Sequence, residues 1–336
     1  MSGLSGVAPA PPSDDILYGF VPDPARGRFL DARMHHELAA SLSHLAEASA
    51  ATPDVAAPLA DAAQRLAAGQ LVGPEAFARY FQIAAQLLAD EPSGLPEHLA
   101  ALTREIATPR GGLTVVPRGG AGELDALMEL RMGAEAADFA LSSAAKAEAL
   151  KARLAEAFAL MKQALPDLHG ELTAITHRVV AAEGRKDSKF QFDGASHYQF
   201  WGMLLLNPAF HPTRLALAEV LTHEISHSLL FGLTIDAPLV FNPDDALYPS
   251  PLRADDRPMD GIYHAAYVSA RMAWAMENLA ASPHLTPEER TDALNRAAED
   301  RANFAAGYSV VEAHGDLSDA GAAIMSRAAA WIAAPH

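Results

Sequence analysis

The sequence contains no cysteine among its 336 residues. Disulfide bonds, thiolate nucleophiles, iron–sulfur clusters and cysteine-ligated zinc sites are therefore excluded. A bound metal ion would have to use nitrogen and oxygen ligands, which the 14 His residues and the carboxylates can supply.

Positive charge is also scarce. The chain has 25 Lys and Arg against 42 Asp and Glu, which gives a formal net charge of −17. This acidity argues against broad contact with nucleic-acid backbones or anionic membrane surfaces, and no uncharged run is typical of a membrane span. Residues 1–16 lack the basic start and apolar core of a secretory signal, so we expect a cytoplasmic protein. Its oligomeric state is not indicated.

Half of the residues are hydrophobic, which is typical of a globular chain, and the length suggests about two domains. In the first part, apolar residues at three- and four-residue spacing predict helices at 29–48, 55–67, 74–88 and 96–107. Proline and glycine predict a loop at 108–122, and a helical stretch follows to about residue 165. We therefore expect a flexible N-terminus (1–25), a helical N-terminal region (26–120) and a catalytic region (121–336).

The pattern changes in the second half. Thr, Ile and Val predict a strand at 171–181, and a short apolar run predicts another at 200–206. The second strand is either a core strand or a sheet edge to which a peptide adds as a further strand. Helices are expected from Thr213 to 231 or 232 and over 258–280, with a capping box at Thr286–Glu289 and two more helices after it. The fold class is thus α+β and predominantly helical, with a small sheet.

The strongest motif is His223-Glu224-Ile225-Ser226-His227, within a predicted helix. Residues four apart lie on one helix face, so both imidazoles can reach one metal ion, with Glu224 beside them. In a protease, Glu224 would be the general base that activates zinc-bound water. The alternative is a pair of core histidines that are satisfied by hydrogen bonds.

Two histidines do not complete a metal site. A catalytic zinc ion usually has three protein ligands, and non-haem iron has two histidines and a third group. The metzincin pattern fails, because Leu230 and Leu233 stand where it requires Gly and His. The candidates for a third ligand are Asp260, His264 and Glu277. The histidines expected at the surface are His35, His36, His284 and His336.

Two arginines four residues apart, Arg253 and Arg257, precede His264 in this acidic chain. The planar guanidinium group matches a carboxylate with two parallel hydrogen bonds, so the pair could bind an acidic ligand. The alternative is surface pairing with Asp255, Asp256 or Asp260.

Three stretches together carry a family resemblance. They are residues 196–206, residues 221–227 around the HExxH motif, and residues 248–267 with an Arg-x-Asp-Asp-Arg-Pro core and Gly-Ile-Tyr-His. They resemble the HExxH peptide-modification proteins found with ribosomally made, post-translationally modified peptides. The chain departs from the family pattern at Leu252 and Ala265.

The resemblance implies an iron(II)- and 2-oxoglutarate-dependent peptide β-hydroxylase with a zincin-like catalytic region, in which the partner is a precursor peptide. It implies that His223, His227 and a third group, for which we favour His264, hold the iron. Arg253 or Arg257 would pair with the distal carboxylate of 2-oxoglutarate. A gluzincin-type zinc peptidase with Glu277 as third ligand, and a non-catalytic peptide-binding protein, are the alternatives.

Overall fold

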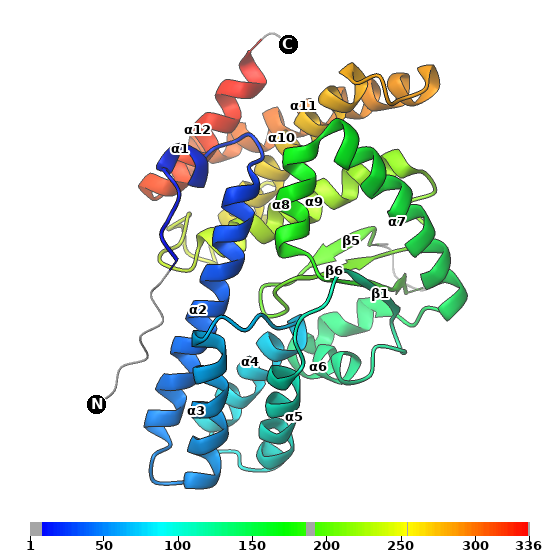
Figure 1. Ribbon diagram of the computed structural model, residues 1–336. Coiled ribbons are helices and arrows are strands. Elements are labelled where there is room, and N and C mark those ends of the chain that lie inside the picture. Colours follow the sequence, from blue (N-terminus) through cyan, green and yellow to red (C-terminus); the bar gives the residue numbers. More distant parts are fainter. Residues whose placement is uncertain (1–8, 186–191, 254, 335–336) are drawn as a thin grey trace. The chain divides into compact units, whose positions relative to one another are not determined.

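The computed structural model describes residues 9–185, 192–253 and 255–334. Helices make up 64% of the structure and the strands form small sheets (Figure 1), which confirms the predominantly helical α+β class. Of the N-terminal segment predicted to be flexible, residues 1–8 lie outside the described ranges, and Asp14–Leu17 forms helix α1. No helix in these ranges is both long and apolar enough to cross a membrane.

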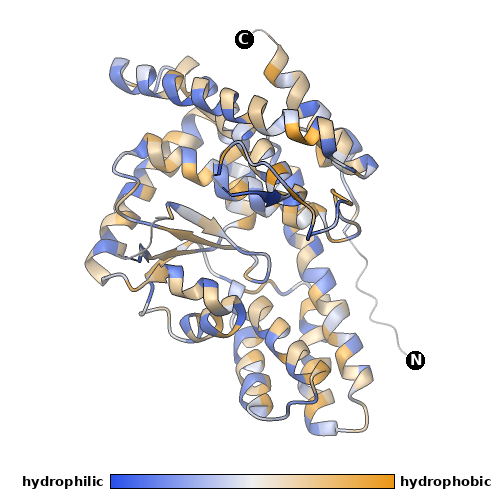
Figure 2. Cartoon of the chain, turned by 180° about the vertical axis from the view of Figure 1, so that it is seen from behind, coloured by the Kyte–Doolittle hydropathy of each residue, from blue (hydrophilic) through white to orange (hydrophobic). Residues whose placement is uncertain are grey.

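The chain forms two compact units, each built from stretches that are far apart in the sequence. The first unit consists mainly of Phe29–Lys151 and Ile175–Phe210. The second comprises Pro11–Arg28, Ala152–Ala174 and the chain from His211 onward. Most helices carry both hydrophilic and hydrophobic residues along their length (Figure 2), as expected of helices that bury one face.

Helices and short strands alternate in the first unit. It contains most of α2 (Pro24–Ala48) and the start of α7 (Ala144–Ala164). Its other helices are α3 (Pro53–Ala67), α4 (Pro74–Leu88), α5 (Leu95–Ala107), α6 (Glu123–Met132) and the 3₁₀ helix η1 (Gly133–Asp138). Its strands are β1 (Thr114–Pro117), β2 (Phe139–Ala140), β3 (Arg178–Ala181), β4 (Glu183–Gly184), β5 (Gly194–Ser196) and β6 (Met203–Leu206).

The main sheet has the strand order β1-β3-β6-β5 within the described residues. β3 pairs in parallel with both β1 and β6, and β5 pairs with β6 in the antiparallel direction. All four residues of β6 are buried. The prediction that the strand at 200–206 forms a receptive sheet edge is therefore wrong, because β3 and β5 occupy both of its edges; the core-strand alternative is confirmed.

The turn before β6 requires a glycine. Gly202 has a φ of +87°, and a Cβ atom there would lie 3.0 Å from the carbonyl oxygen of Ile175. The Gly202 carbonyl accepts hydrogen bonds from the amides of His177 at 2.8 Å and Arg178 at 3.0 Å. This close approach ties the beginning of β3 to the beginning of β6.

The second unit is built around helix pairs. Its elements, besides α1 and the remaining parts of α2 and α7, are α8 (Pro166–Ile175), α9 (Arg214–Leu233), β7 (Leu247–Tyr248), β8 (Arg257–Pro258), α10 (Met259–Ala281), α11 (Pro287–His314) and α12 (Asp319–Ala333). Its core centres on the buried Tyr263 and Tyr267 of α10, with apolar residues from α9, α11 and α12 around them. Gly307 of α11 allows close packing on α10, because a Cβ atom there would lie 3.1 Å from Cβ of Ala266.

Several local predictions need correction. The loop predicted at 108–122 contains β1, and the helical stretch predicted to residue 165 is interrupted by η1 and β2. The strand predicted at 171–181 begins only at Arg178, because Glu171–Ile175 belongs to α8. His35, expected at the surface, is 3% exposed, and its Nε2 accepts a hydrogen bond from the amide of Val72 at 3.0 Å. His336 lies outside the described residues.

Candidate metal centre

Helix α9 places the HExxH motif in the second unit. The Thr213 hydroxyl accepts a hydrogen bond from the amide of Ala216 at 3.1 Å, so the predicted N-cap is confirmed. From Leu215 to Leu230 the helix is buried except for positions that recur every four residues: Glu219, His223 and His227. The two motif histidines therefore lie on the one partly open stripe of an otherwise buried helix.

Helix α10 adds the third histidine. The Nε2 atoms of His223 and His227 are 3.1 Å apart, and Nδ1 of His227 lies 3.0 Å from Nδ1 of His264. Two nitrogen ligands about 2.1 Å from one ion would be roughly 3.0–3.4 Å apart, so each separation is close to that of two nitrogens on one ion, although the two use different nitrogens of His227. His223, His227 and His264, predicted as ligands from the sequence, are thus brought together.

The three rings do not yet converge on one point. His227 turns one ring nitrogen to His223 and the other to His264, and among the described residues no group of three or more His, Asp or Glu side chains is arranged to hold a metal ion. A half-turn of the His227 ring about its Cβ–Cγ bond would exchange Nε2 with Cε1, the atom between its two nitrogens. That single rotation would point Nε2 between the two neighbouring rings. The cluster supplies three imidazoles, which are donors that zinc and iron accept, and the ring orientation of His227 decides whether all three can meet at one ion.

The protonation of the cluster also suits a metal. Burial, reinforced by the proximity of His223 and His264, holds the pKa of His227 well below its ordinary value. Burial likewise lowers the pKa of His264, against the opposing effect of Asp260. Both rings are therefore neutral near pH 7, and a neutral imidazole has the lone pair that a metal needs.

Two side chains border the cluster. Glu224 is 1% exposed, and its Oε1 lies 3.9 Å from Nε2 of His223. Phe231, one helical turn after His227, has its ring 5.6 Å from that of His264 and 6.4 Å from that of His227, centre to centre. Phe231 was not among the predicted site residues, although its four-residue spacing after His227 places it on the same face of the helix.

The other candidate ligands have different positions. Glu277 lies about 20 Å along α10 from His264, at roughly 1.5 Å per residue, and forms an ion pair with Arg301. Asp260 is one helical turn before His264, with Oδ1 3.9 Å from Nε2 of that histidine. The structure therefore brings His264 to the HExxH pair and keeps Asp260 nearby, whereas Glu277 is engaged elsewhere.

The two arginines lie near the hairpin that precedes α10. Arg257 is in β8, and its Nε is 3.0 Å from Oδ2 of Asp255. Arg253 is exposed in the preceding loop. The ion pair of Arg257 is the surface pairing weighed above as the alternative to carboxylate binding.

A buried charge cluster contacts α9 at Ser226, next to His227 in the chain. Nε of Arg271 lies 3.4 Å from the hydroxyl oxygen of Ser226, and its guanidinium group donates to the carbonyl of Phe20 at 2.8 Å. The same guanidinium donates to the buried carboxylate of Glu171, which also accepts from Nε of Arg26 at 2.8 Å. This cluster could not be predicted from the sequence, because its members are distant in the chain.

No protein-family profile matches the chain, and no curated protein matches it.

Proposed function

We propose that the chain is an iron(II)- and 2-oxoglutarate-dependent hydroxylase that acts in the cytoplasm on a ribosomally made precursor peptide, with a zincin-like catalytic region around α9. The observation that carries the proposal is the position of His264, whose Nδ1 is 3.0 Å from Nδ1 of His227. Glu277, the third ligand of the competing peptidase hypothesis, is held by Arg301 instead.

His223, His227 and His264 would hold the iron, which supplies oxygen-dependent oxidation of a C–H bond when bound with 2-oxoglutarate. Access to the site, shielding of the rings and charge balance are provided by the side chains of the protein. The partly open stripe of α9 admits ligands from one side, and Phe231 shields the rings of His227 and His264. Glu224 places a negative charge beside the cationic centre that three neutral imidazoles and a divalent ion would form.

The 2-oxoglutarate carboxylate needs a cationic partner in this proposal. Arg257 would have to exchange Asp255 for the ligand. This is feasible because the ion pair is exposed to solvent: the side chain of Arg257 is 41% exposed and that of Asp255 is 66% exposed. Arg253 in the same loop is the other choice.

A zinc peptidase is the second candidate, and Glu224 favours it. A catalytic zinc ion held by three histidines with an adjacent carboxylate base has the components of metal-assisted hydrolysis. The two candidates differ in their requirement for 2-oxoglutarate, so one experiment separates them.

The test begins with metal and cosubstrate binding. Anaerobic addition of iron(II) and then 2-oxoglutarate should produce a visible charge-transfer absorption band, and dioxygen should then yield succinate even without peptide. His264→Ala should lose the band and bind iron at least about tenfold more weakly. His284→Ala, which removes an exposed histidine in the same unit, is the matched control and should retain both.

Two outcomes would reject the hydroxylase. The first is zinc-dependent cleavage of unstructured peptides with no effect of 2-oxoglutarate. The second is a full-strength band in His264→Ala, which would remove the observation on which the proposal depends.

A further inference from the structure

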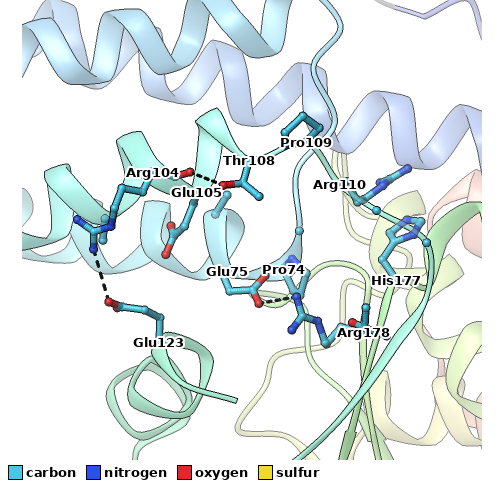
Figure 3. Close-up of a pocket in the computed structure, with 16 residues that line it drawn as sticks. Pro74, Glu75, Arg104, Glu105, Thr108, Pro109, Arg110, Glu123, His177 and Arg178 are labelled. Atoms are coloured by element: carbon cyan, nitrogen blue, oxygen red, sulfur yellow. Dashed lines mark hydrogen bonds and ion pairs between the residues drawn. The ribbon is translucent and has the colours of Figure 1, made fainter. Parts of the chain in front are cut away.

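A cavity within the first unit has paired charges in its wall (Figure 3). Nη2 of Arg178 lies 2.9 Å from Oε1 of Glu75, and Nη2 of Arg104 lies 3.5 Å from Oε1 of Glu123. Because acidic and basic side chains neutralise each other around this cavity, its charges favour neither an anion nor a cation. A cavity within the second unit differs in this respect.

The second cavity lies between α10 and α11 and has a volume of about 800 Å³. Small-molecule sites range from roughly 300 to 1,000 Å³. Ala281, Leu294 and Ala298 in its wall are exposed, so the cavity opens to solvent as a groove. The groove therefore presents apolar surface to water, including the side chain of Leu294 at 52% exposure.

The groove is elongated along α11. Its lining residues on this helix recur at three- and four-residue spacing from Arg290 to Arg301, so they share one helix face. The two arginines are eleven positions apart, which is about 16 Å along the helix. The lining positions between them are the apolar residues Leu294, Ala297 and Ala298. An extended alkyl chain matches this shape better than a compact ring system does.

A positive charge lies at one end of the groove. The guanidinium group of Arg290 donates to the carbonyl of Ala280 and, at 3.1 Å, to that of Ser282. Both contacts are to uncharged carbonyl groups at the end of α10, and the part of the chain that the structure describes supplies no carboxylate to Arg290. A guanidinium group has five N–H donors, so donors remain for a carboxylate.

The charges at the other end are neutralised. Arg301 forms an ion pair with Glu277, in which Nη2 lies 3.0 Å from Oε2, and its Nη1 donates to the carbonyl of Ile332 at 2.6 Å. The guanidinium carbon of Arg301 also lies 5.0 Å from the centre of the Trp331 ring. Trp274 adds a second half-buried indole to the lining. The groove thus combines one unneutralised cation with a long apolar wall.

We propose that this groove binds a free single-chain carboxylic acid, such as a medium-chain fatty acid. The carboxylate lies against Arg290, and the alkyl chain runs along the apolar face of α11 towards the two tryptophans. The groove is separate from the histidine cluster, because Trp274 is ten residues after His264, about 15 Å along α10. Occupancy of the groove is therefore independent of the proposed hydroxylase activity.

Tryptophan fluorescence provides the measurement on the unmodified chain. Of its three tryptophans, Trp201 is 3% exposed in the first unit, and the other two line the groove. A ligand that removes water from the half-buried indoles should shift their emission to shorter wavelength. Trp274→Phe and Trp331→Phe should each reduce this shift, which assigns the signal to the groove.

Three probes separate the head group from the chain. Dodecanoate carries both, dodecyltrimethylammonium has the same chain with a cationic head group, and acetate has the carboxylate alone. Dodecanoate should bind saturably below about 1 mM, the cationic probe should bind at least about tenfold more weakly, and acetate should not saturate up to about 10 mM. The net charge of −17 attracts the cationic probe in general, so tighter binding of the anion identifies a local positive site.

The probe series can overturn the proposal in two ways. One is the absence of a saturable emission change with dodecanoate up to about 1 mM. The other is dodecyltrimethylammonium binding that is as tight as that of dodecanoate, which would remove the role of Arg290.

Two variants locate the binding. Arg290→Gln should weaken dodecanoate about tenfold or more but not the cationic probe, and Ala298→Phe, which fills the groove at an exposed position, should weaken both. The matched controls are Arg327→Gln on α12 and Ala302→Phe at an exposed position of α11; neither residue lines the groove. Controls that weaken dodecanoate as much as the groove variants would reject the assignment. Circular dichroism verifies that each variant is folded, and the probe series stands without them.

Discussion

Glu171 is a residue whose charge is held far from water. Its side chain is fully buried, as are those of its partners Arg26 and Arg271, at 1% exposure or less. Burial alone would raise the pKa of Glu171, but the two guanidinium groups outweigh it and hold the pKa below its usual value. A carboxylate in this setting stabilises the fold because removing it leaves buried cationic groups uncompensated.

The first prediction concerns Glu171→Gln. This change should lower the free energy of unfolding by about 3–5 kcal/mol, the loss expected when one member of a buried ion pair is removed. Urea denaturation followed by circular dichroism measures it. Glu148→Gln, which removes an exposed carboxylate 3.5 Å from Lys151, should change stability by less than about 0.5 kcal/mol. Equal effects of the two changes would contradict the buried-cluster argument.

Asp300 on α11 has the opposite electrostatic setting. It is 5% exposed, and its Oδ2 has no hydrogen-bond partner among the residues described. Burial, together with the nearby Glu219 and Glu299, raises the pKa of Asp300 to about 8. The folded chain therefore holds a proton on Asp300 that the unfolded chain releases above about pH 4.

The second prediction follows from this proton. Because the folded pKa is raised, the contribution of Asp300 is fully present below about pH 4 and is lost as the pH rises towards 8. Asp300→Asn should remove this loss and be more stable than the unmodified chain at pH 8, by about 1–3 kcal/mol, but not at pH 4. Urea unfolding at several pH values measures the difference. Asp244→Asn, the same change at an exposed loop position, should follow the unmodified chain throughout.

At the scale of elements, α11 shows how a local sequence signal specifies structure. The Thr286 hydroxyl accepts from the amide of Glu289 at 3.2 Å, and the Glu289 carboxylate accepts from the amide of Thr286 at 2.9 Å. The predicted capping box is confirmed. Glu289 also accepts from Arg214, which begins α9, and this hydrogen bond is the main reason that its pKa falls to about 2.

The third prediction concerns this cap. Thr286→Ala should destabilise the chain by about 1 kcal/mol, because the amide of Glu289 at the helix start loses its acceptor, the Thr286 hydroxyl. Thr291→Ala, one turn further along α11, is the matched control and should be neutral or slightly stabilising, since Ala is the better helix former. Thermal unfolding of the two variants measures the difference. Equal changes in stability for Thr286→Ala and Thr291→Ala would contradict a specific role of the cap.

Local signals explain which elements could be predicted. Periodic segments such as α4, α9 and α11, which begin with a proline at the first turn or a threonine cap, follow from residues within or next to the element itself. β1 was missed because its Val115 and Val116 stand in a Pro- and Gly-rich stretch and pair with β3, more than about 60 residues later. The pairing of the two HExxH histidines on one face followed from helix geometry, and the choice of His264 over Asp260 and Glu277 came from the family resemblance. Phe231 and the Arg271 cluster depend on tertiary packing.

At the scale of the whole molecule, each unit has its own apolar core. The core of the first unit joins Leu124 and Leu127 of α6 to β3 and β6, and that of the second unit centres on α10. The composition of the loop at 108–122 predicts a boundary near residue 120, and this boundary stays a prediction. Sequence periodicity cannot reveal a unit assembled from separated stretches, because it reports only neighbours along the chain.

The fourth prediction uses this division into units. If the histidine cluster binds a metal, adding zinc(II) or anaerobic iron(II) should slow amide hydrogen exchange in α9 and α10 while leaving β1, β3 and β6 unchanged. Exchange measured by mass spectrometry resolves these segments. His264→Ala should show no such protection, and equal slowing in both units would contradict a metal site confined to the second.

The burial of β6 has a consequence for the newly made chain. The run from Phe200 to Leu206 has no charge and no proline, which is the composition that drives unfolded chains to stack against one another. One edge of β6 pairs with β5, which lies within about ten residues before it in the chain. The other edge pairs with β3, which lies further back. Both β3 and β5 precede β6 in the chain, so they have already been synthesised when β6 leaves the ribosome. The aggregation-prone segment can therefore pair soon after it is made, and its exposure during synthesis is short.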